Sequence, residues 1–569
     1  MTQVGQAAET PDVAPESGAQ PTGQRPSEPR HWRYSLPGLA GALVFVCLSL
    51  SPSLLPRTGV IQGLVCGITG AMGYGVGVVA AWVWRAFVDR GPRRTTHRSW
   101  RVFAVVSCVC LVAAMTFGRY WQGQIRMRMG VAPDGLSSLL VTPLVAVLVF
   151  VALIASARAL RGLYRWAARR LERWIGPRAA HAVGWTAVVV GTGLLVSGVV
   201  LDGLVAAADE AFSVRNGATE PGVVQPVVSQ RSGSAESLVP WTSLGRQGRN
   251  FTGTGPAPEQ IAAFTGSAAN MPIRAYAGLD SAATAEQRAQ LAVEDLARAG
   301  GFGRRTLVVI TTTGSGWVDP GAVDSVEYMT GGDSATVSMQ YSYLPSWMSY
   351  LVDQERAREA GRALFDAVYD RWSRLPMDNR PRLVVVGESL GSFGGETAFS
   401  GEYDLRNRTA GAIFAGPPNF NVLYREFVDG RDVGSPEVTP VYRGGRTVRF
   451  SNDPQSSIPP ADRAWDGARV LYLQHASDPI VWWSPRLIAH RPDWLDEPRG
   501  DDVVTAMRWI PLVTFWQVSA DLPFATEVPT GHGHVYTREY VDAWEHVLQP
   551  PGWTQHNAEL LRAIIAPPS

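Results

Sequence analysis

The sequence predicts an α-helical membrane region followed by an α/β domain with a mainly parallel, doubly wound sheet. Apolar segments long enough to cross a bilayer follow one another between residues 36 and 204. From residue 273 onward, strand-like and helix-like segments alternate, which is typical of a parallel sheet covered by helices on both faces. A strand that runs into a Gly-x-Ser-x-Gly turn lies in the middle of this alternation.

The N-terminal third is expected to lie in the cell membrane. Residues 1–30 are rich in Pro, Gly and polar residues, which predicts a disordered cytoplasmic tail. Residues 31–208 predict about five transmembrane helices, with four as the alternative because the third apolar segment is short. The five segments are 36–55, 59–84, 102–117, 139–157 and 182–204.

Arginines predict the orientation of this membrane region, and glycines predict how its helices pack. Arginines crowd between the second and third segments and between the fourth and fifth, so these connections and the N-terminus should be cytoplasmic. An odd number of spans then places everything beyond Asp209 outside the cytoplasm, in a multi-pass protein of the cell membrane. Within the second segment, Gly63-x-x-x-Gly67 and Gly73-x-x-x-Gly77 predict close packing of neighbouring helices.

Residues 209–256 are rich in Gly, Ser, Thr and Pro without periodicity, and predict a linker or an extended strap. The α/β domain is expected over residues 257–569. Its expected strands lie near 273–279, 306–313, 335–341, 383–386, 410–414, 469–475 and 515–518. Its expected helices lie near 285–299, 349–375, 391–398 and 538–548.

Composition limits the functions to consider. The chain has 569 residues, too many for one ordinary domain, and its 46% hydrophobic content and net charge of +1 give no indication of nucleic-acid binding. All four cysteines lie in apolar stretches at or before residue 110. We therefore expect neither a disulfide framework nor a metal site. Nothing in the sequence calls for an organic cofactor or indicates an oligomeric state.

The central motif is Gly387-Glu388-Ser389-Leu390-Gly391, between a β-branched run and a helix of small residues. In such a nucleophile elbow the serine adopts strained backbone dihedrals. Strand and helix pass so closely that the residues two before and two after the serine must be nearly free of side chain. Gly387 and Gly391 meet that need, and Ser389 is the candidate nucleophile.

A serine hydroxyl needs a base, and the base needs an acid that holds its tautomer. In hydrolases of this kind the acid and then the histidine follow the serine in the chain. Asp478 lies just beyond the carboxyl end of the strand expected at 469–475 and is the candidate acid, with Asp462 and Asp466 as weaker substitutes. In a later glycine-rich loop, His534 is the preferred base because a helix follows at the usual distance, and His532 is the alternative.

Backbone donors are expected to stabilise the oxyanion of an acyl transfer reaction. One is the N–H of Leu390, directly after the nucleophile. The other belongs to Thr313 or Gly314, in a loop after the strand expected at 306–313. Four tryptophans on nearby loops could line an acyl pocket: Trp317, Trp347, Trp482 and Trp483.

Five motifs carry a resemblance to one protein family. They are SPSLLPR at 51–57, QYSYLPSW at 340–347, GESLGSFGGE at 387–396, HASDPIVWWSP at 475–485 and GHGHVY at 531–536. Over nearly all of its length after the tail, the chain resembles the actinobacterial membrane-anchored α/β-hydrolases, which join a multi-span N-terminal domain to an α/β-hydrolase catalytic domain. The resemblance implies an α/β-hydrolase fold and a serine hydrolase at the outer membrane face, without a particular substrate.

We therefore expect a serine hydrolase of the esterase or lipase type. Its membrane placement favours lipid or cell-envelope esters as substrates and membrane lipids as partners. Two alternatives stay open. An acyl-enzyme can pass its acyl group to an alcohol if water is excluded, which would make the chain an acyltransferase. The chain could also be a membrane-anchored binding or assembly module, although such a module has no need for a nucleophile, an acid and a base in this order.

Overall fold

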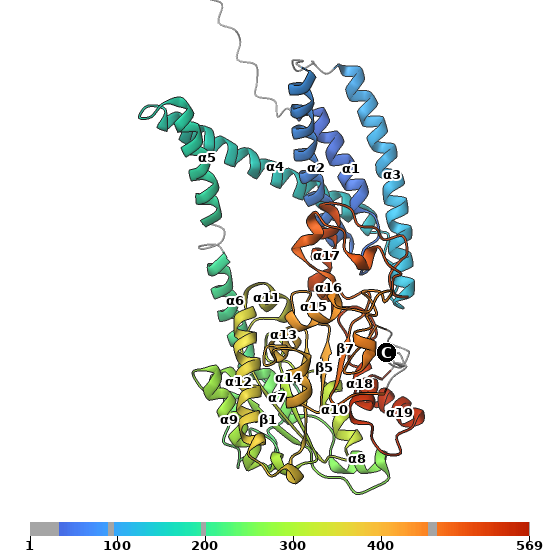
Figure 1. Cartoon of the computed structure of the whole chain (residues 1–569). Helices are drawn as coiled ribbons and strands as arrows, with labels where there is room; N and C mark the ends of the chain where they lie inside the picture. The colour runs from blue at the N-terminus through green and yellow to red at the C-terminus, as the bar shows by residue number, and fades with distance from the viewer. Residues whose placement is uncertain (1–33, 89–95, 195–200, 453–463, 568–569) are drawn as a thin grey trace, which may run out of the picture.

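A computed structural model describes residues 34–88, 96–194, 201–452 and 464–567. It contains a helical N-terminal region and an α/β domain, which lie one above the other in Figure 1. The tail expected at residues 1–30 lies outside the described residues.

The α/β domain is built on seven parallel strands in the order β1-β3-β2-β4-β5-β7-β6. The predicted fold class is thereby confirmed. β4, which leads into the Gly-x-Ser-x-Gly turn, is the central strand. The strands are β1 (Ile273–Ala277), β2 (Thr306–Thr311), β3 (Ser334–Met339), β4 (Arg382–Glu388), β5 (Gly411–Ala415), β6 (Val448–Ser451) and β7 (Arg469–Leu473).

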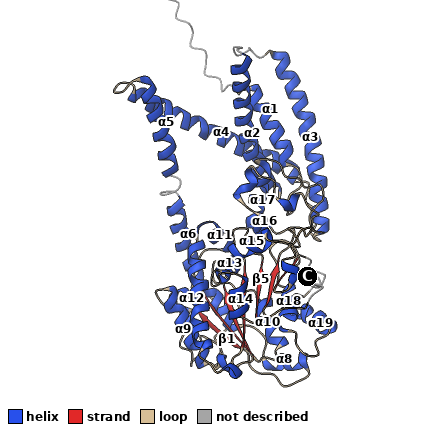
Figure 2. Cartoon of the chain, viewed as in Figure 1, coloured by secondary structure: helices blue, strands red, loops and turns tan. Residues whose placement is uncertain are grey.

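Helices cover both faces of the sheet (Figure 2). One hydrophobic core joins the sheet to α9 (Ala285–Arg298), α12 (Gln354–Ser373) and α13 (Leu390–Glu396). A second core joins it to α10 (Pro320–Met329) and α18 (Glu539–Leu548). Successive side chains of a strand point to opposite faces, so Val385 enters the first core while Val384 and Val386 enter the second.

Three elements differ from the sequence prediction. The strand expected at 515–518 is wrong, because these residues lie in helix α17 (Val513–Asp521); a short apolar run does not distinguish a buried strand from a buried helix. The helix expected at 349–375 is divided into α11 (Ser346–Val352) and α12, since Asp353 has non-helical dihedrals (φ −128°, ψ 24°). Strand β6 was not predicted. The other helices are α7 (Gly245–Gly253), α8 (Pro258–Thr265), α14 (Glu402–Arg408), α15 (Val422–Asp429), α16 (Pro479–Trp482) and α19 (Gln555–Ile565).

The described N-terminal region is helical. α2, α3 and α4 are long and apolar enough to cross a membrane, and α1 is apolar but shorter. The fifth expected segment, 182–204, includes residues 195–200, which lie outside the described residues, and its described parts belong to α5 and α6. The helices are α1 (Leu36–Ser49), α2 (Gly59–Val88), α3 (His97–Arg128), α4 (Ser138–Leu171), α5 (Pro177–Leu194) and α6 (Leu201–Asn216).

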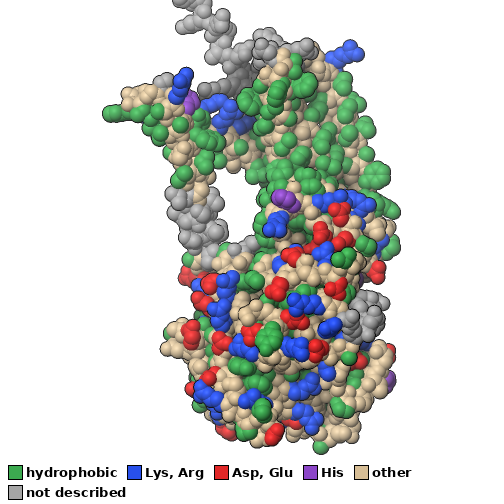
Figure 3. Space-filling model, in the orientation of Figure 1, with side chains coloured by type: hydrophobic (Ala, Val, Ile, Leu, Met, Phe, Trp, Pro, Cys, Tyr) green, Lys and Arg blue, Asp and Glu red, His purple; other side chains and the backbone are tan. Residues whose placement is uncertain are grey.

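Glycines of α2 allow its neighbours to approach closely. A Cβ added to Gly77 would lie 2.3 Å from the carbonyl oxygen of Pro37 in α1, and one added to Gly63 would lie 2.7 Å from that of Thr142 in α4. The predicted packing role of the two Gly-x-x-x-Gly motifs is confirmed. In the view of Figure 3, hydrophobic side chains cover α1–α3, whereas charged side chains are frequent on the α/β domain.

The first expected span ends earlier than predicted. α1 stops at Ser49, and the chain from 50 to 58, which we call the docking loop, turns toward the α/β domain. Leu54 and Leu55, expected in the membrane, are 0% and 1% exposed and belong to the first core of the α/β domain. Ile125 and Met129, near the end of α3, join the same core.

The segment 209–256 is partly helical, since α6 extends to Asn216 and α7 occupies Gly245–Gly253. Between these helices, Arg231 forms an isolated parallel bridge with Arg274 of β1. The N–H of Ser232 donates to the carbonyl of Arg274 (3.0 Å), and its hydroxyl donates to buried Asp295 of α9. Arg231 and Ser232 thus lie beside the edge strand of the sheet.

Candidate active site

Ser389 occupies the turn between β4 and α13 with strained dihedrals (φ 55°, ψ −127°). The glycines on either side are required by close backbone contacts. A Cβ on Gly387 would lie 2.3 Å from the carbonyl oxygen of Gly391, and one on Gly391 would lie 2.2 Å from that of Thr311 in β2. The turn therefore has the geometry predicted for a nucleophile elbow.

Asp478 and His534, the predicted acid and base, are 56 residues apart in the sequence and in contact in the structure. Nδ1 of His534 lies 2.6 Å from Oδ2 of Asp478. Asp478 lies just beyond β7 and is fully buried. Its Oδ1 accepts from the N–H of Ile480 (2.8 Å), and its Oδ2 also accepts from the hydroxyl of Tyr536 (2.7 Å). Three donors thus fix the orientation of this carboxyl group.

The other imidazole nitrogen of His534, Nε2, is buried and has no hydrogen-bond partner among the described residues. The end of β5 connects this ring to the elbow. The N–H of Ser389 donates to the carbonyl of Ala415 (2.9 Å), and the next residue, Gly416, packs against the ring so closely that a Cβ would lie 2.2 Å from Cε1 of His534. Ser389 and His534 therefore border the same backbone turn.

His532, the alternative base, has a different partner. Its Nδ1 lies 3.5 Å from Asp502, a residue that the sequence did not suggest, and the hydroxyl of Ser477 also donates to Asp502. Of the substitute acids, Asp466 pairs with Arg406 in an exposed contact (3.1 Å), and Asp462 lies outside the described residues. The structure thus brings His534, and not His532, to Asp478.

The expected oxyanion donors lie around the elbow. Leu390 is the first residue of α13, where a helical N–H has no acceptor within its own helix. The N–H of Thr313 instead donates to the carbonyl of Trp317 (3.1 Å), while its hydroxyl is buried without a partner among the described residues. Gly314 approaches the carbonyl of Leu344 so closely that a Cβ would lie 2.5 Å from it.

A second buried layer, missed from the sequence, supports the loop that carries His534. Nδ1 of His475 lies 2.9 Å from the carbonyl oxygen of Gly533, and its ring stacks on Tyr536 with ring centroids 4.2 Å apart. Its Nε2 lies 3.7 Å from buried Glu539. Burial lowers the pKa of His475, but Glu539, Asp502 and the carbonyl of Gly533 together raise it above its ordinary value. The sequence held a signal for these two residues, since His475 begins the motif HASDPIVWWSP and Tyr536 ends the motif GHGHVY.

Two further carboxyl groups lie beneath the elbow. Burial, followed by the charge of Asp319, raises the pKa of Glu388 well above its ordinary range, and Glu388 accepts a hydrogen bond from the hydroxyl of Tyr540 (2.9 Å). Burial raises the pKa of Asp319 to about 6. Asp319 accepts hydrogen bonds from the N–H of Gly321 and the hydroxyl of Thr537. Carboxyl groups thus gather below Ser389, and the described charges that act on Glu388 come from other carboxyl groups, Asp319 first among them.

Aromatic side chains form a continuous row from the elbow to α17. Phe393 of α13 contacts Phe420, which contacts Tyr350 of α11; Tyr350 contacts Trp483, which contacts Phe515 of α17. Successive ring centroids are 5.0 to 5.9 Å apart. Of the tryptophans expected to line an acyl pocket, Trp483 belongs to this row. Trp482 is instead fully buried, and its indole N–H donates to the carbonyl of His475.

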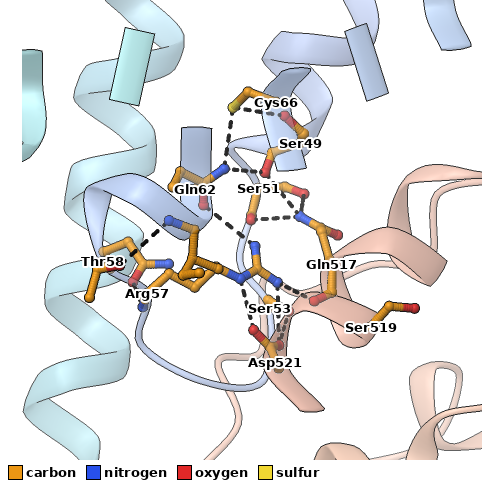
Figure 4. A network of polar contacts seen from close by, with 12 residues as sticks. Ser49, Ser51, Ser53, Arg57, Thr58, Gln62, Cys66, Gln517, Ser519 and Asp521 are labelled. Atoms are coloured by element: carbon orange, nitrogen blue, oxygen red, sulfur yellow. Dashed lines mark hydrogen bonds and ion pairs between the residues drawn. The ribbon is translucent and has the colours of Figure 1, made fainter. Parts of the chain in front are cut away.

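The docking loop contacts the α/β domain through a buried polar network (Figure 4). Arg57, 4% exposed, donates from Nε to Asp521 of α17 (2.8 Å) and from Nη2 to the carbonyl of Gln517 (2.7 Å). Asp521 also accepts from Ser53 (2.5 Å), and Gln517 donates to the carbonyl of Ser51 (3.0 Å). The network therefore joins residues 460 or more positions apart.

The docking loop also reaches the loop that carries the candidate base. A Cβ added to Gly533 would lie 3.5 Å from a methyl group of Leu55, which is ordinary contact distance. Gly533 is held by two hydrogen bonds, with its carbonyl oxygen 2.9 Å from Nδ1 of His475 and its N–H donating to the hydroxyl of Ser477 (2.8 Å), and Leu55 lies close by.

Among the residues that the structure describes, no three His, Cys, Asp or Glu side chains converge in a metal-binding arrangement.

Comparison with protein-family models finds two matches that together span most of the chain. Residues 273–561 match the α/β-hydrolase family, and residues 50–256 match the N-terminal region of the same family. No curated protein and no solved structure matches. The chain therefore belongs to the α/β-hydrolase family.

Proposed function

We propose that this chain is a membrane-anchored serine hydrolase that cleaves carboxylic esters through an acyl-enzyme on Ser389. The observation that carries the proposal is the hydrogen-bonded pair of His534 and Asp478 beside a strained elbow serine. Strain at a serine between a strand and a helix has a known use, because it exposes the hydroxyl to a bound carbonyl group.

The chemistry follows from the positions of the three groups. Oγ of Ser389 attacks the ester carbonyl while Nε2 of His534 removes its proton, and the imidazolium then gives that proton to the departing alkoxide. Asp478 holds the proton of Nδ1 and stabilises the imidazolium. Water then attacks the acyl-enzyme while Nε2 of His534 removes its proton. The imidazolium returns this proton to Oγ of Ser389, and the carboxylic acid is released. Tyr536 and Ile480, which also bond to Asp478, keep this carboxylate in place throughout.

Donors for the oxyanion come from both sides of the elbow. We assign the N–H of Leu390 as one donor, because it lies at the start of α13. The N–H of Thr313 is used by Trp317, so the second donor is the N–H of Gly314 or the unpartnered hydroxyl of Thr313. Two such donors contribute several kcal/mol to stabilisation of a tetrahedral intermediate, about 3 kcal/mol each.

The aromatic row supports an ester with an apolar acyl chain. It begins at α13, next to the nucleophile, and ends on α17, which packs against α1 and α2 of the helical region. An acyl chain along these rings would pass from the apolar helices to Ser389. We therefore propose lipid or cell-envelope esters as the substrate class, with the membrane as their source.

The side of the membrane on which the α/β domain lies is inferred from the positions of the arginines. The docking loop places the start of α2 against the α/β domain, so the arginines at the end of α2 and the start of α3 lie at the far end of the helices (Figure 1). Because arginines favour the cytoplasmic side, we propose that the α/β domain lies outside the cytoplasm.

Acyl transfer to an alcohol is the second candidate, and one observation favours it. Ser389 and His534 are only 2% and 6% exposed, and an acyl-enzyme shielded from water survives until an alcohol arrives. A glycerol or sugar added to the assay distinguishes the two, because transfer yields a new ester and hydrolysis yields only the free acid.

The test uses the full chain in detergent with p-nitrophenyl esters from acetate to palmitate. We expect Ser389→Ala and His534→Ala to lower kcat by roughly 10⁴-fold or more, and His532→Ala by less than about tenfold. Equal losses for the two histidine variants would overturn the assignment of the base. Undiminished activity in Ser389→Ala would overturn the proposal as a whole.

A further inference from the structure

We propose that a cavity between α2, α3 and α4, next to the docking loop, binds the phosphate-bearing headgroup of an anionic lipid. The cavity has a volume of about 230 Å³ and lies apart from the candidate active site. Its lining includes Arg57 and Gln62 of the network in Figure 4.

The cavity lies where two long helices begin side by side. A Cβ added to Gly59, the first residue of α2, would lie 2.9 Å from Cα of Ser138, the first residue of α4. The hydroxyl of Thr142 donates to the carbonyl of Gly59 (3.1 Å) and fixes this approach. The positive ends of two helix dipoles therefore point toward the same space.

Two arginines of α3 add full positive charges. Arg119 donates to the carbonyls of Asp134 and Gly135 and to the hydroxyl of Ser138 at 3.2 to 3.4 Å. Arg126 donates to the carbonyls of Ala132 and Arg57, each at 3.0 Å. These acceptors orient the guanidinium groups but carry no charge to neutralise them.

The local negative charge is insufficient to balance these arginines. Asp134 lines the cavity, but it lies 4.0 Å from Arg126 and is 31% exposed. Nε of Arg126 is buried and has no hydrogen-bond partner among the described residues. Arg57 is already paired with Asp521 outside the cavity. A bound anion with several acceptor oxygens would satisfy the free donor and the excess charge, and phosphate matches the fork of donors of a guanidinium group.

Apolar groups indicate that the anion belongs to a lipid. Leu50, Met115 and Leu139 line the cavity beside the arginines. On the same two helices, Val112 of α3 and Leu140 of α4 are 62% and 77% exposed, so apolar surface continues outward from the cavity. A free phosphate ion would gain nothing from these side chains, whereas the glycerol and acyl parts of a lipid would cover them.

Arg57 connects this cavity to the α/β domain, since it lines the cavity and bonds to α17. A bound headgroup would hold Arg57 and Arg126 together through charge and would stabilise the docking loop. We therefore expect anionic lipid to raise the melting temperature of the full chain.

The experiment measures binding of short-chain phosphatidylglycerol and phosphatidylcholine to the full chain in nonionic detergent by native mass spectrometry, with inorganic phosphate as competitor. We expect selective binding of phosphatidylglycerol, weakened about tenfold by Arg119→Gln and by Arg126→Gln. The matched control is Arg128→Gln, because Arg128 is on the same helix and does not line the cavity. It should leave binding unchanged.

A second pair of variants separates lost binding from lost folding. Gly123 lines the cavity, and a Cβ there meets no atom within 4 Å, so Gly123→Leu fills the space while both arginines stay. Gly162→Leu on α4 is its control, since Gly162 is equally open and lies outside the lining. Loss of binding in Gly123→Leu alone supports the proposal. Equal binding of both lipids, binding unaffected by the arginine and Gly123 variants, or displacement by phosphate at the affinity of the lipid would overturn the lipid site.

Discussion

The helical region and the α/β domain are connected in two ways that differ in character. The covalent connection runs through α5 and α6, whose described side chains are exposed along most of their length. The noncovalent connection is formed by the docking loop, where Arg57, Leu54 and Leu55 are at most 4% exposed, together with Ile125 and Met129 of α3. The comparison teaches that the two parts are held together by a contact between distant segments, while the peptide chain between them contributes little burial.

The most severe way to break this contact is to remove the docking loop. A chain that begins at residue 201 lacks Leu54 and Leu55, and each buried leucine contributes about 2–5 kcal/mol. We expect this fragment to be inactive and to aggregate or lose its cooperative melting transition. The control is the full chain cut at a protease site inserted near exposed Trp174: its two pieces should co-purify and keep ester hydrolysis. A stable, active fragment would contradict the role of the docking loop.

Arg57→Ala tests how much one ion pair between the docking loop and α17 contributes to stability. It leaves Asp521 buried and unpaired, so we expect a loss of about 3–5 kcal/mol in the free energy of unfolding. In the double variant with Asp521→Ala the loss should be smaller than the sum of the single losses, measured by denaturant unfolding. The exposed pair Arg374–Asp370 is the matched control, where Arg374→Ala should cost less than about 1 kcal/mol. Additive losses at Arg57 and Asp521 would show that the two side chains act independently.

Leu55→Ala tests whether the docking loop positions the candidate base. We expect about 2–5 kcal/mol of lost stability and a lower kcat at unchanged KM, because buried Leu55 lies near Gly533, the residue before His534. Leu136→Ala, at a position that is 74% exposed, should change neither quantity. Reduced stability with an unchanged kcat would limit Leu55 to a structural role.

Asp319→Asn gives the smallest effect and concerns the α/β domain alone. The native pKa of Asp319 is about 6, raised from 3.8 by burial, so the unfolded chain releases this proton first. The contribution of Asp319 to stability should therefore fall as pH rises from about 4 to about 6 and level off above that, by on the order of 2–3 kcal/mol. Asp319→Asn should reduce the slope of stability against pH in melting curves recorded between those pH values, while other buried carboxyl groups such as Glu388 keep their own contribution. An unchanged slope in Asp319→Asn would assign the dependence to another group.

The sequence was most informative where the physical constraint is local. The glycines at 387 and 391 predicted the turn because strand and helix cannot pass otherwise, and the structure has both close contacts. The fold class followed from the alternation of strands and helices. The position of Asp478 at the end of a strand and of His534 before a helix followed from chain order, and the structure places their side chains 2.6 Å apart.

The sequence was least informative where contacts join distant segments. Leu54 and Leu55 continue the apolar run of α1, so composition alone placed them in the membrane rather than in the core of the α/β domain. Helix α17, which bonds to the docking loop through Gln517 and Asp521, was predicted as a strand, because its short apolar run fits either structure. The support of Gly533 by His475 likewise depends on packing between loops that no local pattern shows.

The most direct test of the proposed function is active-site labelling of the full chain with a fluorophosphonate probe, read by intact-protein mass and peptide mapping. We predict a single adduct on Ser389 that disappears in His534→Ala and persists in His532→Ala. No adduct on Ser389 in the wild-type chain, under conditions where a control serine hydrolase is labelled, would contradict the account and favour a binding module.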